Sequence, residues 1–277
     1  MPDPLYIEDH GSVRLLRMDR PPANATGLSL RRALVAALRY TAIDSKVTAL
    51  VLIGTGRFFS AGADIGELGT PDNQAHPRLR DVIDALESHP KPIVAAINGI
   101  AYGGGLELAL GCTSRVAPSD ARFALPEVKL GLIPGAGGTQ RLPRLVGLGP
   151  AIELITSGEP LTAAKAKSIG LIDEILPEPF AGNAVRFAKS MANGNPVPDR
   201  MAGAANGAAR LLEAARTRSS GGRAIEAALL CLEAATWMSF EEGMRIEHEQ
   251  VMGLIGSAEA QALRQEFFEK RRGGRTC

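Results

Sequence analysis

Two uninterrupted apolar runs, each ending in glycine, most constrain the fold of this 277-residue chain. "VTALVLIGTG" covers residues 47–56 and "KPIVAAING" covers residues 91–99. Runs of this kind are typical of strands that are buried on both faces of a parallel sheet. A shorter strand pattern over 13–18 and amphipathic helical patterns over 28–43 and 76–88 alternate with them. This alternation predicts an α/β architecture.

The character of the chain changes near residue 190. Residues 192–200, "ANGNPVPDR", carry the breakers that are typical of a linker. The remainder is rich in Ala, Leu, Glu and Arg, and we expect helices over 203–217, 222–237, 240–253 and 257–272. The sequence therefore predicts a core over residues 1–190 and a helical C-terminal region over residues 191–277.

Composition excludes several classes of protein. A net charge of +1 gives no indication of a nucleic-acid partner, and no apolar run approaches the roughly 20 residues that span a bilayer. The N-terminus lacks the layout of a signal peptide. Cys112, Cys231 and Cys277 are odd in number and have no CxxC spacing, so neither disulfides nor zinc are indicated. We expect a soluble, reduced, cytoplasmic protein that binds no metal, membrane or nucleic acid.

Glycine is concentrated in stretches that resemble no phosphate-binding motif. "AINGIAYGGGLELALGC" covers residues 96–112, but a GxGxxG fingerprint begun at its triple glycine requires glycine at Leu108. One begun at Gly135 requires glycine at Gln140. There is no P-loop and no GxSxG elbow, and no histidine lies in these stretches. A serine or cysteine nucleophile activated by histidine is therefore not indicated.

Two glutamates in these surroundings suggest acid–base chemistry instead. Glu107 follows the triple glycine, and Glu127 lies in "FALPEVKLGLIPGAGGTQRLPRLVG". Paired carboxylates suit proton transfer, in which one group handles water and the other gives a proton. Backbone N–H groups of the triple glycine, and of the glycine-bearing turn over 57–68, could together bind a developing negative oxygen. An oxyanion hole without a nucleophile suits enolate chemistry on an acyl group.

Each of these features also has an ordinary interpretation when it is taken alone. Glu107 fits an acidic residue in the first turn of a helix, and Glu127 after Pro126 fits a helix start. Asp64 fits a turn or capping residue. The coincidence of three glycine-rich turns and two glutamates within about 80 residues favours a site.

At these residues the sequence resembles the crotonase (enoyl-CoA hydratase/isomerase) superfamily. The matching segments are "DRPPANATGLSL", "GRFFSAGADIGEL", "KPIVAAINGIAYGGGLELALGC" and "LPEVKLGLIPGAGGTQRLPRLVG". The match continues through "ELITSGEPLTAAKAKSIGLIDEI" to about residue 176. The resemblance implies an α/β spiral of ββα units followed by a C-terminal helical region, binding of acyl-CoA thioesters, and assembly into homotrimers or hexamers.

The resemblance also implies roles for individual residues. The two oxyanion N–H groups would belong to Ala63 and Gly104, and the catalytic glutamates of hydratases match Glu107 and Glu127. The "SAGADI" loop would run along coenzyme A, which assigns CoA contacts to Ser60, Ala61, Gly62, Asp64 and Ile65. Coenzyme A is part of the substrate in this family, so no separate cofactor is expected.

The reaction implied is hydration of a trans-2-enoyl-CoA to a 3-hydroxyacyl-CoA. A Δ3-Δ2-enoyl-CoA isomerase, or another enolate reaction on acyl-CoA, is the alternative within enzymes, and a silent acyl-CoA-binding scaffold subunit is the alternative outside them. Pro21 and Pro22 stand where many simple hydratases carry a lysine, and the pattern is closer to the N-terminal half of multifunctional β-oxidation enzymes. A separate dehydrogenase partner is therefore an open expectation.

Overall fold

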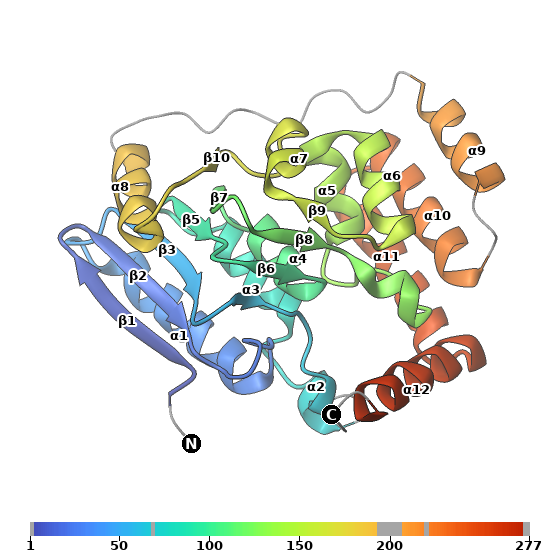
Figure 1. Ribbon diagram of the computed structural model, residues 1–277, viewed down its shortest axis with the longest axis horizontal. Coiled ribbons are helices and arrows are strands. Elements are labelled where there is room, and N and C mark those ends of the chain that lie inside the picture. The colour runs from blue at the N-terminus through green and yellow to red at the C-terminus, as the bar shows by residue number, and fades with distance from the viewer. Residues whose placement is uncertain (1–2, 68–69, 193–206, 219–221, 274–277) are drawn as a thin grey trace. The chain divides into compact units, whose positions relative to one another are not determined.

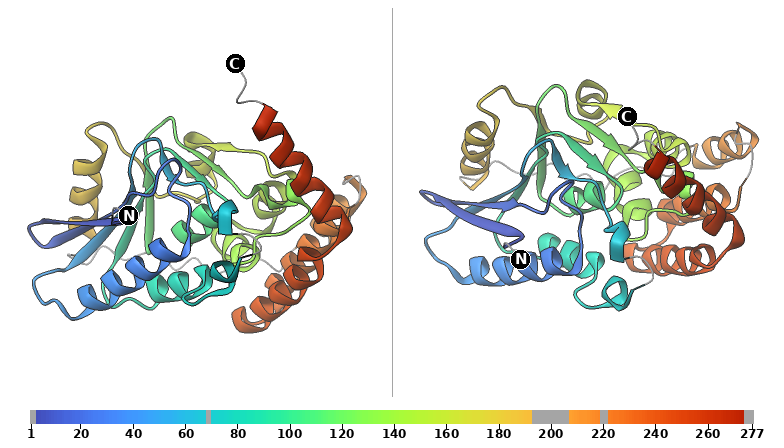
Figure 2. Two further views of the ribbon diagram at one scale, coloured as in Figure 1. Left: turned by 90° about the horizontal axis from the view of Figure 1, so that it is seen from below. Right: turned by 60° about the horizontal axis from the view of Figure 1, so that its bottom comes forward.

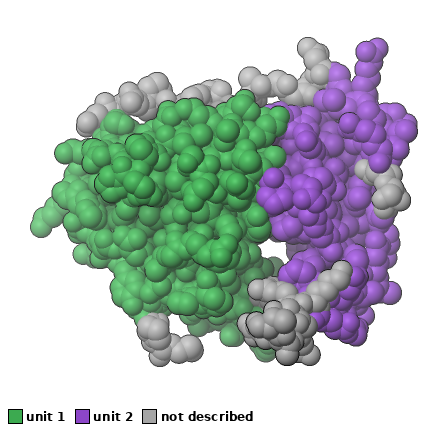
Figure 3. Space-filling model, viewed as in Figure 1, with its two compact units in different colours: residues 1–123, 161–199 green, residues 124–160, 200–277 purple. Residues whose placement is uncertain are grey.

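The computed structural model describes residues 3–67, 70–192, 207–218 and 222–273 (Figure 1). The chain divides into two compact units, coloured differently in Figure 3. Unit 1 contains residues 1–123 and 161–199, and unit 2 contains residues 124–160 and 200–277. The predicted linker over 192–200 lies almost wholly outside the described residues, and the domain division at residue 190 stays a prediction.

Unit 1 is built on a six-stranded sheet with the order β1-β2-β3-β5-β7-β10. The β1–β2 hairpin is antiparallel, and the following strands are added in parallel. The strands are β1 (Leu5–His10), β2 (Val13–Met18), β3 (Ala49–Gly54), β5 (Ile93–Ala96), β7 (Ser114–Ala117) and β10 (Glu174–Ile175). The parallel sheet predicted from the apolar runs is confirmed.

Helices cover both faces of this sheet, which explains why its central strands are apolar throughout. All residues of β3 and β5 are buried. Alternate residues of four strands, among them Val13, Val51 and Val94, pack with Phe180 and Ala184 of α8 (Phe180–Ala192). Figure 2 shows α8 on one side of the sheet, and α1 (Leu28–Ile43) and α3 (Leu79–Glu87) on the other.

A second sheet has the order β4-β6-β8-β9, and its strands alternate along the chain with those of the first. These strands are β4 (Phe58–Ser60), β6 (Ile100–Tyr102), β8 (Arg122–Ala124) and β9 (Leu161–Thr162). Each pair β1–β2, β3–β4 and β5–β6 is followed by a helix, namely α1, α3 and α4 (Gly104–Leu110). A 3-10 turn and the short helix α2 (Pro71–Gln74) lie between β4 and α3. The predicted succession of ββα units is therefore confirmed, and it places the loops after β4 and β6 beside one another.

Unit 2 is helical. The 3-10 helix η2 (Pro126–Leu130), α5 (Gly138–Val146) and α6 (Leu148–Ser157) pack with the C-terminal helices. Those helices are α9 (Ala208–Arg218), α10 (Arg223–Trp237), α11 (Phe240–Ile255) and α12 (Ala258–Gly273). The helices α10, α11 and α12 match three of the predicted helices to within a few positions. The helix predicted over 203–217 ends within one residue of α9, and the first part of that prediction, residues 203–206, lies outside the described residues. No helix in the described parts of the chain is long and apolar enough to cross a membrane.

Candidate active site

The loop after β4 depends on a glycine that no other residue could replace without strain. Gly62 has φ +92°, in the region that L side chains rarely adopt. A Cβ there would lie 2.8 Å from the carbonyl oxygen of Tyr102 and 3.0 Å from the nitrogen of Gly104. Glycine therefore allows this loop to approach the segment that begins α4.

The triple glycine meets the same loop from the other side. Gly103, with φ +53°, precedes α4, and a Cβ on Gly104 would lie 3.5 Å from the Ala63 nitrogen. A Cβ on Gly105 would lie only 2.2 Å from the Ser60 carbonyl oxygen. Side chains are absent here because backbone packs against backbone. The triple glycine therefore marks a close approach of two backbone segments.

This close approach places two backbone donors side by side. Neither the Ala63 N–H nor the Gly104 N–H donates a hydrogen bond to another residue in the part of the chain that the structure describes. Ala63 is exposed, whereas Gly104 is buried. Buried backbone donors are almost always paired, so the available N–H of the buried Gly104, with that of Ala63 beside it, marks a place where a ligand oxygen could bind.

Glu107 lies one turn into α4 and is only 3% exposed. Burying a carboxylate among apolar residues is costly, so its position demands a reason beyond helix capping. The far end of the helix is held by Arg115, whose Nη1 donates to the carbonyl oxygens of Cys112 (2.8 Å) and Ala109 (3.4 Å). The structure thus brings Ala63, Gly104 and Glu107 together in unit 1.

The neighbouring thiol is unsuited to nucleophilic chemistry. Burial raises the pKa of the Cys112 thiol to about 12, although the charge of Arg115 opposes this shift. Cys112 therefore stays protonated near neutral pH, and a thiol rather than a thiolate is a weak nucleophile. Among the described residues no group of His, Cys, Asp and Glu could hold a metal ion. The chemistry of this part of unit 1 is left to Glu107 and the backbone donors.

Glu127 lies in unit 2, in the 3-10 helix η2. Two glycines bring other parts of this unit against that helix. A Cβ on Gly131, which has φ +69°, would lie 2.8 Å from Cα of Ala260 in α12, and one on Gly158 would lie 3.0 Å from Cα of Pro126. Lys129 also pairs with Glu159 at 2.8 Å. The turn after α6 and the helix α12 therefore hold the segment that carries Glu127.

The second glycine-rich segment, residues 135–138, has a different environment from the first. The buried carboxylate of Glu247 in α11 accepts hydrogen bonds from the N–H groups of Gly137 (2.7 Å) and Thr139 (3.1 Å), and from the Thr139 hydroxyl (2.6 Å). Its donors are thus used inside unit 2. No sequence signal distinguishes this segment from the triple glycine.

The residues expected to contact CoA fall into two groups. Ala61 is exposed, whereas Ser60 and Gly62 are buried and linked by a hydrogen bond from the Gly62 N–H to the Ser60 hydroxyl (3.2 Å). Asp64 forms an ion pair with Arg20 and accepts from the Gly66 N–H at 2.8 Å, and Ile65 begins the 3-10 turn η1 (Ile65–Glu67). Asp64 therefore braces the loop, and its contact with CoA, like those of the other four, stays a prediction.

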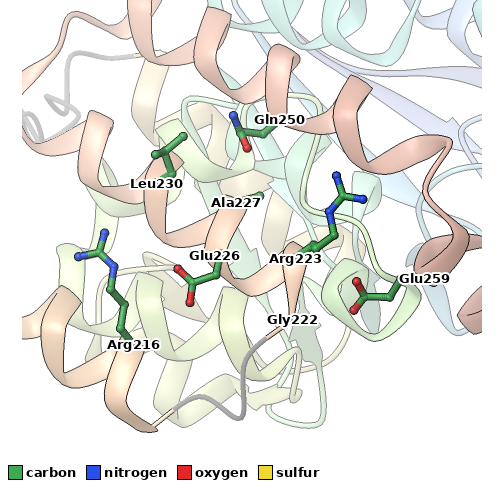
Figure 4. A pocket seen from close by; sticks show the side chains of 8 residues that line it. All are labelled: Arg216, Gly222, Arg223, Glu226, Ala227, Leu230, Gln250 and Glu259. Atoms are coloured by element: carbon green, nitrogen blue, oxygen red, sulfur yellow. The ribbon is translucent and has the colours of Figure 1, made fainter.

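Unit 2 also carries a surface hollow of about 640 Å³, shown in Figure 4. It contains none of the residues singled out from the sequence. Its charged lining residues have opposite signs: Arg216, Arg223, Glu226 and Glu259. Arg216 is paired with Glu233 at 2.8 Å. The hollow therefore shows no concentrated charge that would attract the phosphates of CoA.

Residues that brace the loop were missed by sequence reasoning. Glu67 accepts from the Leu28 N–H at 2.7 Å, and so caps α1. Asn24, Thr26 and Arg31 are buried polar residues around the same loop. The sequence shows them only as polar positions in a glycine- and proline-rich stretch, and nothing in that pattern indicates their burial.

Comparison with known proteins identifies the family of the chain. The family model described as enoyl-CoA hydratase/isomerase matches residues 8–220. The peroxisomal bifunctional enzyme of Danio rerio is 40% identical over 268 residues, which are 94% of this chain and 37% of that protein. The chain thus spans little more than a third of the length of that relative.

Shorter relatives and solved structures agree with the same family. The 2,3-dehydroadipyl-CoA hydratase of Escherichia coli (strain K12) is 40% identical over 200 residues, covering 70% of this chain and 77% of the relative. The crystal structure of an enoyl-CoA hydratase/isomerase from Pseudoalteromonas atlantica T6c has a TM-score of 0.74 at 25% identity, covering 96% of this chain and 97% of that one. The resemblance to the crotonase fold is confirmed, and the chain belongs to the enoyl-CoA hydratase/isomerase family.

Proposed function

We propose that this enzyme hydrates trans-2-enoyl-CoA thioesters to 3-hydroxyacyl-CoA. The observation that carries the proposal is the pair of available N–H groups, of Ala63 and Gly104, beside the buried Glu107. Donors aimed at one oxygen in a water-poor site stabilise charge that develops there, and each is worth about 3–4 kcal/mol. The thioester carbonyl oxygen of the substrate would occupy this position.

The chemistry follows from polarising that carbonyl. Withdrawal of electrons toward the oxygen makes the β-carbon of the enoyl chain electrophilic. Glu107 orients a water molecule and removes its proton as the water oxygen bonds to the β-carbon. Glu127 then delivers a proton to the α-carbon as the enolate collapses, so that one water is added across the double bond. Both glutamates act as acid–base groups, and neither forms a bond to the substrate.

Purified protein with crotonyl-CoA, and with a longer trans-2-enoyl-CoA, would test this mechanism. Loss of the conjugated enoyl-thioester absorbance would report hydration and would rank the two chain lengths. We expect rapid loss with the native protein and strongly reduced loss with Glu107→Gln and with Glu127→Gln. Absence of turnover with both substrates, despite measurable CoA binding, would contradict the hydratase proposal.

Isomerisation of a 3-enoyl-CoA to the 2-enoyl form is the second candidate. It requires only removal and return of a proton beside the same oxyanion hole, and Glu107, buried in the first turn of α4, would be the group that transfers this proton. Product analysis with a 3-enoyl-CoA substrate distinguishes the two reactions. A 3-hydroxyacyl product indicates that hydration follows, and accumulation of the 2-enoyl product indicates isomerisation alone.

The assembly and partners of the protein are further proposals. We infer homotrimers or hexamers from the family, and sedimentation of the purified protein would test this. Coenzyme A enters as part of the substrate, without a separate cofactor. A dehydrogenase that oxidises the 3-hydroxyacyl product would be a chemically suitable partner, and a cytoplasmic location stays a prediction.

A further inference from the structure

Thr26 lies beside the loop after β4 and is only 1% exposed. Both of its donors bind one acceptor: its N–H donates to the carbonyl oxygen of Gly62 at 2.8 Å, and its hydroxyl donates to the same oxygen at 3.1 Å. Double donation by one residue to a single carbonyl restricts the direction in which that carbonyl points. The proposed mechanism assigns Thr26 no role.

The restricted carbonyl shares a peptide group with an oxyanion donor. The Gly62 carbonyl and the Ala63 N–H belong to one planar unit, and in a trans peptide they point in opposite directions. A glycine before this unit leaves it freer to rotate than another residue would, and Gly62 is held at φ +92°. Whatever fixes the Gly62 oxygen therefore also fixes the direction of the Ala63 N–H.

We propose that Thr26 is a positioning residue that aims the Ala63 N–H at the thioester oxygen through its double hydrogen bond to Gly62. The inference rests on the proposed function, because it assigns a task to the oxyanion hole of that reaction. In this role Thr26 acts through the Gly62–Ala63 peptide, because both of its donors bind the Gly62 carbonyl oxygen.

Thr26 can serve as a reference point because the segment before it is anchored. Asn24, which has φ +50° and is 2% exposed, donates from Nδ2 to the carbonyl oxygens of Thr55 (3.0 Å) and Phe58 (2.7 Å). It also accepts from the Arg20 N–H at 3.0 Å. These bonds join the segment to the turn between β3 and β4, so that Thr26 is held by the sheet that precedes the loop.

The two ends of the loop are also restrained by the same segment. The Ala61 N–H donates to the carbonyl oxygen of Ala23 at 2.9 Å, and Arg20 pairs with Asp64. Residues on both sides of the Gly62–Ala63 peptide are therefore tied down. The remaining freedom is rotation of the Gly62–Ala63 peptide, and the hydrogen bond from the Thr26 hydroxyl opposes this rotation.

The test is a pair of substitutions at Thr26. Thr26→Val replaces the hydroxyl by a methyl group of similar size and leaves the backbone bond to Gly62 intact, and Thr26→Ser restores the hydroxyl. Loss of an oxyanion donor costs about 100- to 1,000-fold in kcat, and an indirect loss of aim costs less. For Thr26→Val we expect kcat to fall about 10-fold with KM within about twofold, and for Thr26→Ser we expect kcat near the native value.

Thr48 provides a matched control. Its N–H and its hydroxyl donate to one carbonyl oxygen, that of Ser12, at 2.8 and 3.3 Å, before the start of β3. Thr48→Val removes the same kind of hydroxyl bond away from the loop, and we expect unchanged kcat. Thermal unfolding of each variant shows whether a fall in kcat reflects loss of folded protein.

A second measurement separates this inference from the proposed reaction. Saturated butyryl-CoA, labelled with ¹³C at the thioester carbonyl, binds without being hydrated, and its C=O stretch falls in frequency when the oxygen accepts hydrogen bonds. We expect a lowered stretch in the native protein and in Thr26→Ser, and a smaller shift in Thr26→Val. Equal shifts in all three, or equal losses of kcat in the Val and Ser variants, overturn the role of Thr26 and leave the hydratase proposal standing. No shift in the native protein overturns the oxyanion hole, and with it the role of Thr26.

Discussion

Two glycine-rich segments look alike in the sequence and differ in the structure. In unit 1, the triple glycine at the start of α4 leaves the Gly104 N–H, together with that of Ala63, without an acceptor among the described residues. In unit 2, the segment at the start of α5 gives the N–H groups of Gly137 and Thr139 to the carboxylate of Glu247. Each helix start thus lies near a buried glutamate.

The difference lies in how each glutamate is used. Glu247 reaches from α11 and binds the donors of another helix, so that carboxylate and donors satisfy one another inside unit 2. Glu107 lies on the same short helix as the Gly104 donor, in the first turn of α4. A glycine-rich segment becomes a site only where the protein supplies no acceptor of its own for its N–H groups.

Glu107→Gln tests whether Glu107 is a catalytic group, and we expect it to have the largest effect of these substitutions. The substitution keeps the shape of the side chain and removes the base, so we expect kcat for hydration to fall about 1,000-fold. The free energy of unfolding should change little. Steady-state assays with crotonyl-CoA and urea unfolding measure the two quantities. Native turnover in this variant would break the comparison, because Glu107 would then be as structural as Glu247.

Gly105→Ala tests whether backbone packing sets the unit 1 segment apart. A Cβ there meets the Ser60 carbonyl oxygen at 2.2 Å, and the backbone can relieve this contact only by moving β4 away from α4. We expect the free energy of unfolding to fall by about 3 kcal/mol, as is typical of severe overpacking. Denaturant unfolding followed by circular dichroism measures it.

Gly135→Ala is the control from the unit 2 segment. The nearest atom to its Cβ is Cγ2 of Val251 at 3.2 Å, a side-chain atom that can shift by a few tenths of an ångström. We expect a change below about 1 kcal/mol. Equal losses in Gly105→Ala and Gly135→Ala would show that the two segments are packed alike.

Glu247→Gln tests whether Glu247 stabilises unit 2 without taking part in catalysis. The amide turns a donor toward one of the N–H or hydroxyl groups that the carboxylate accepts from, so we expect a loss of about 2 kcal/mol in unfolding free energy. The kcat of the folded protein should remain near native. A large fall in kcat without loss of stability would contradict the assignment of Glu247 to the scaffold.

Cysteine alkylation can locate that loss within the chain. Cys231 lies in α10 of unit 2 and Cys112 follows α4 of unit 1, and burial raises the pKa of each thiol to about 12. Both should resist alkylation in the native protein at pH 8. In Glu247→Gln we expect faster labelling of Cys231 than of Cys112, measured by mass spectrometry of peptides. The reverse order would place the damage in unit 1.

The smallest expected effect is the stability that acid removes at β1, the edge strand of the unit 1 sheet. The hydrogen bond from Arg17 lowers the pKa of Glu8, and that from Arg14 lowers the pKa of Asp9. A lowered folded-state pKa contributes stability above the unfolded value near 4, and this stability is lost as the pH falls further. Both carboxylates are more than a third exposed, so screening limits the effect to about 0.5–1 kcal/mol for the two.

Amide hydrogen exchange at pH 7 and at pH 3.5, corrected for the intrinsic rates, would measure this effect. We expect the amides of β1 to lose protection from exchange while those of β3 and α4 change little. Acid would then loosen the sheet edge before the segment that carries Glu107. Arg17→Met should reduce the pH dependence of β1. Earlier loss of protection in α4 would indicate that its carboxylate controls acid stability instead.

Much of unit 1 followed from sequence pattern. Continuous apolar runs are compatible with strands covered on both faces, and β3 and β5 lie within the ranges predicted for them. The short strands β4, β6, β8 and β9 were not predicted, because two or three residues carry no measurable periodicity. Their pairing depends on partners far away in the chain.

The candidate site divides in the same way. Sequence pattern is enough to show where side chains are absent, at Gly62 and the triple glycine, and that a charge at Glu107 stands among apolar residues. The folded chain determines that the N–H groups of Ala63 and Gly104 stay available while those of Gly137 and Thr139 bind Glu247, and that Thr26 holds the Gly62 carbonyl. The physical reason is that glycine fixes what a backbone is permitted to do, whereas a hydrogen bond depends on which distant acceptor the folded chain brings within 3 Å.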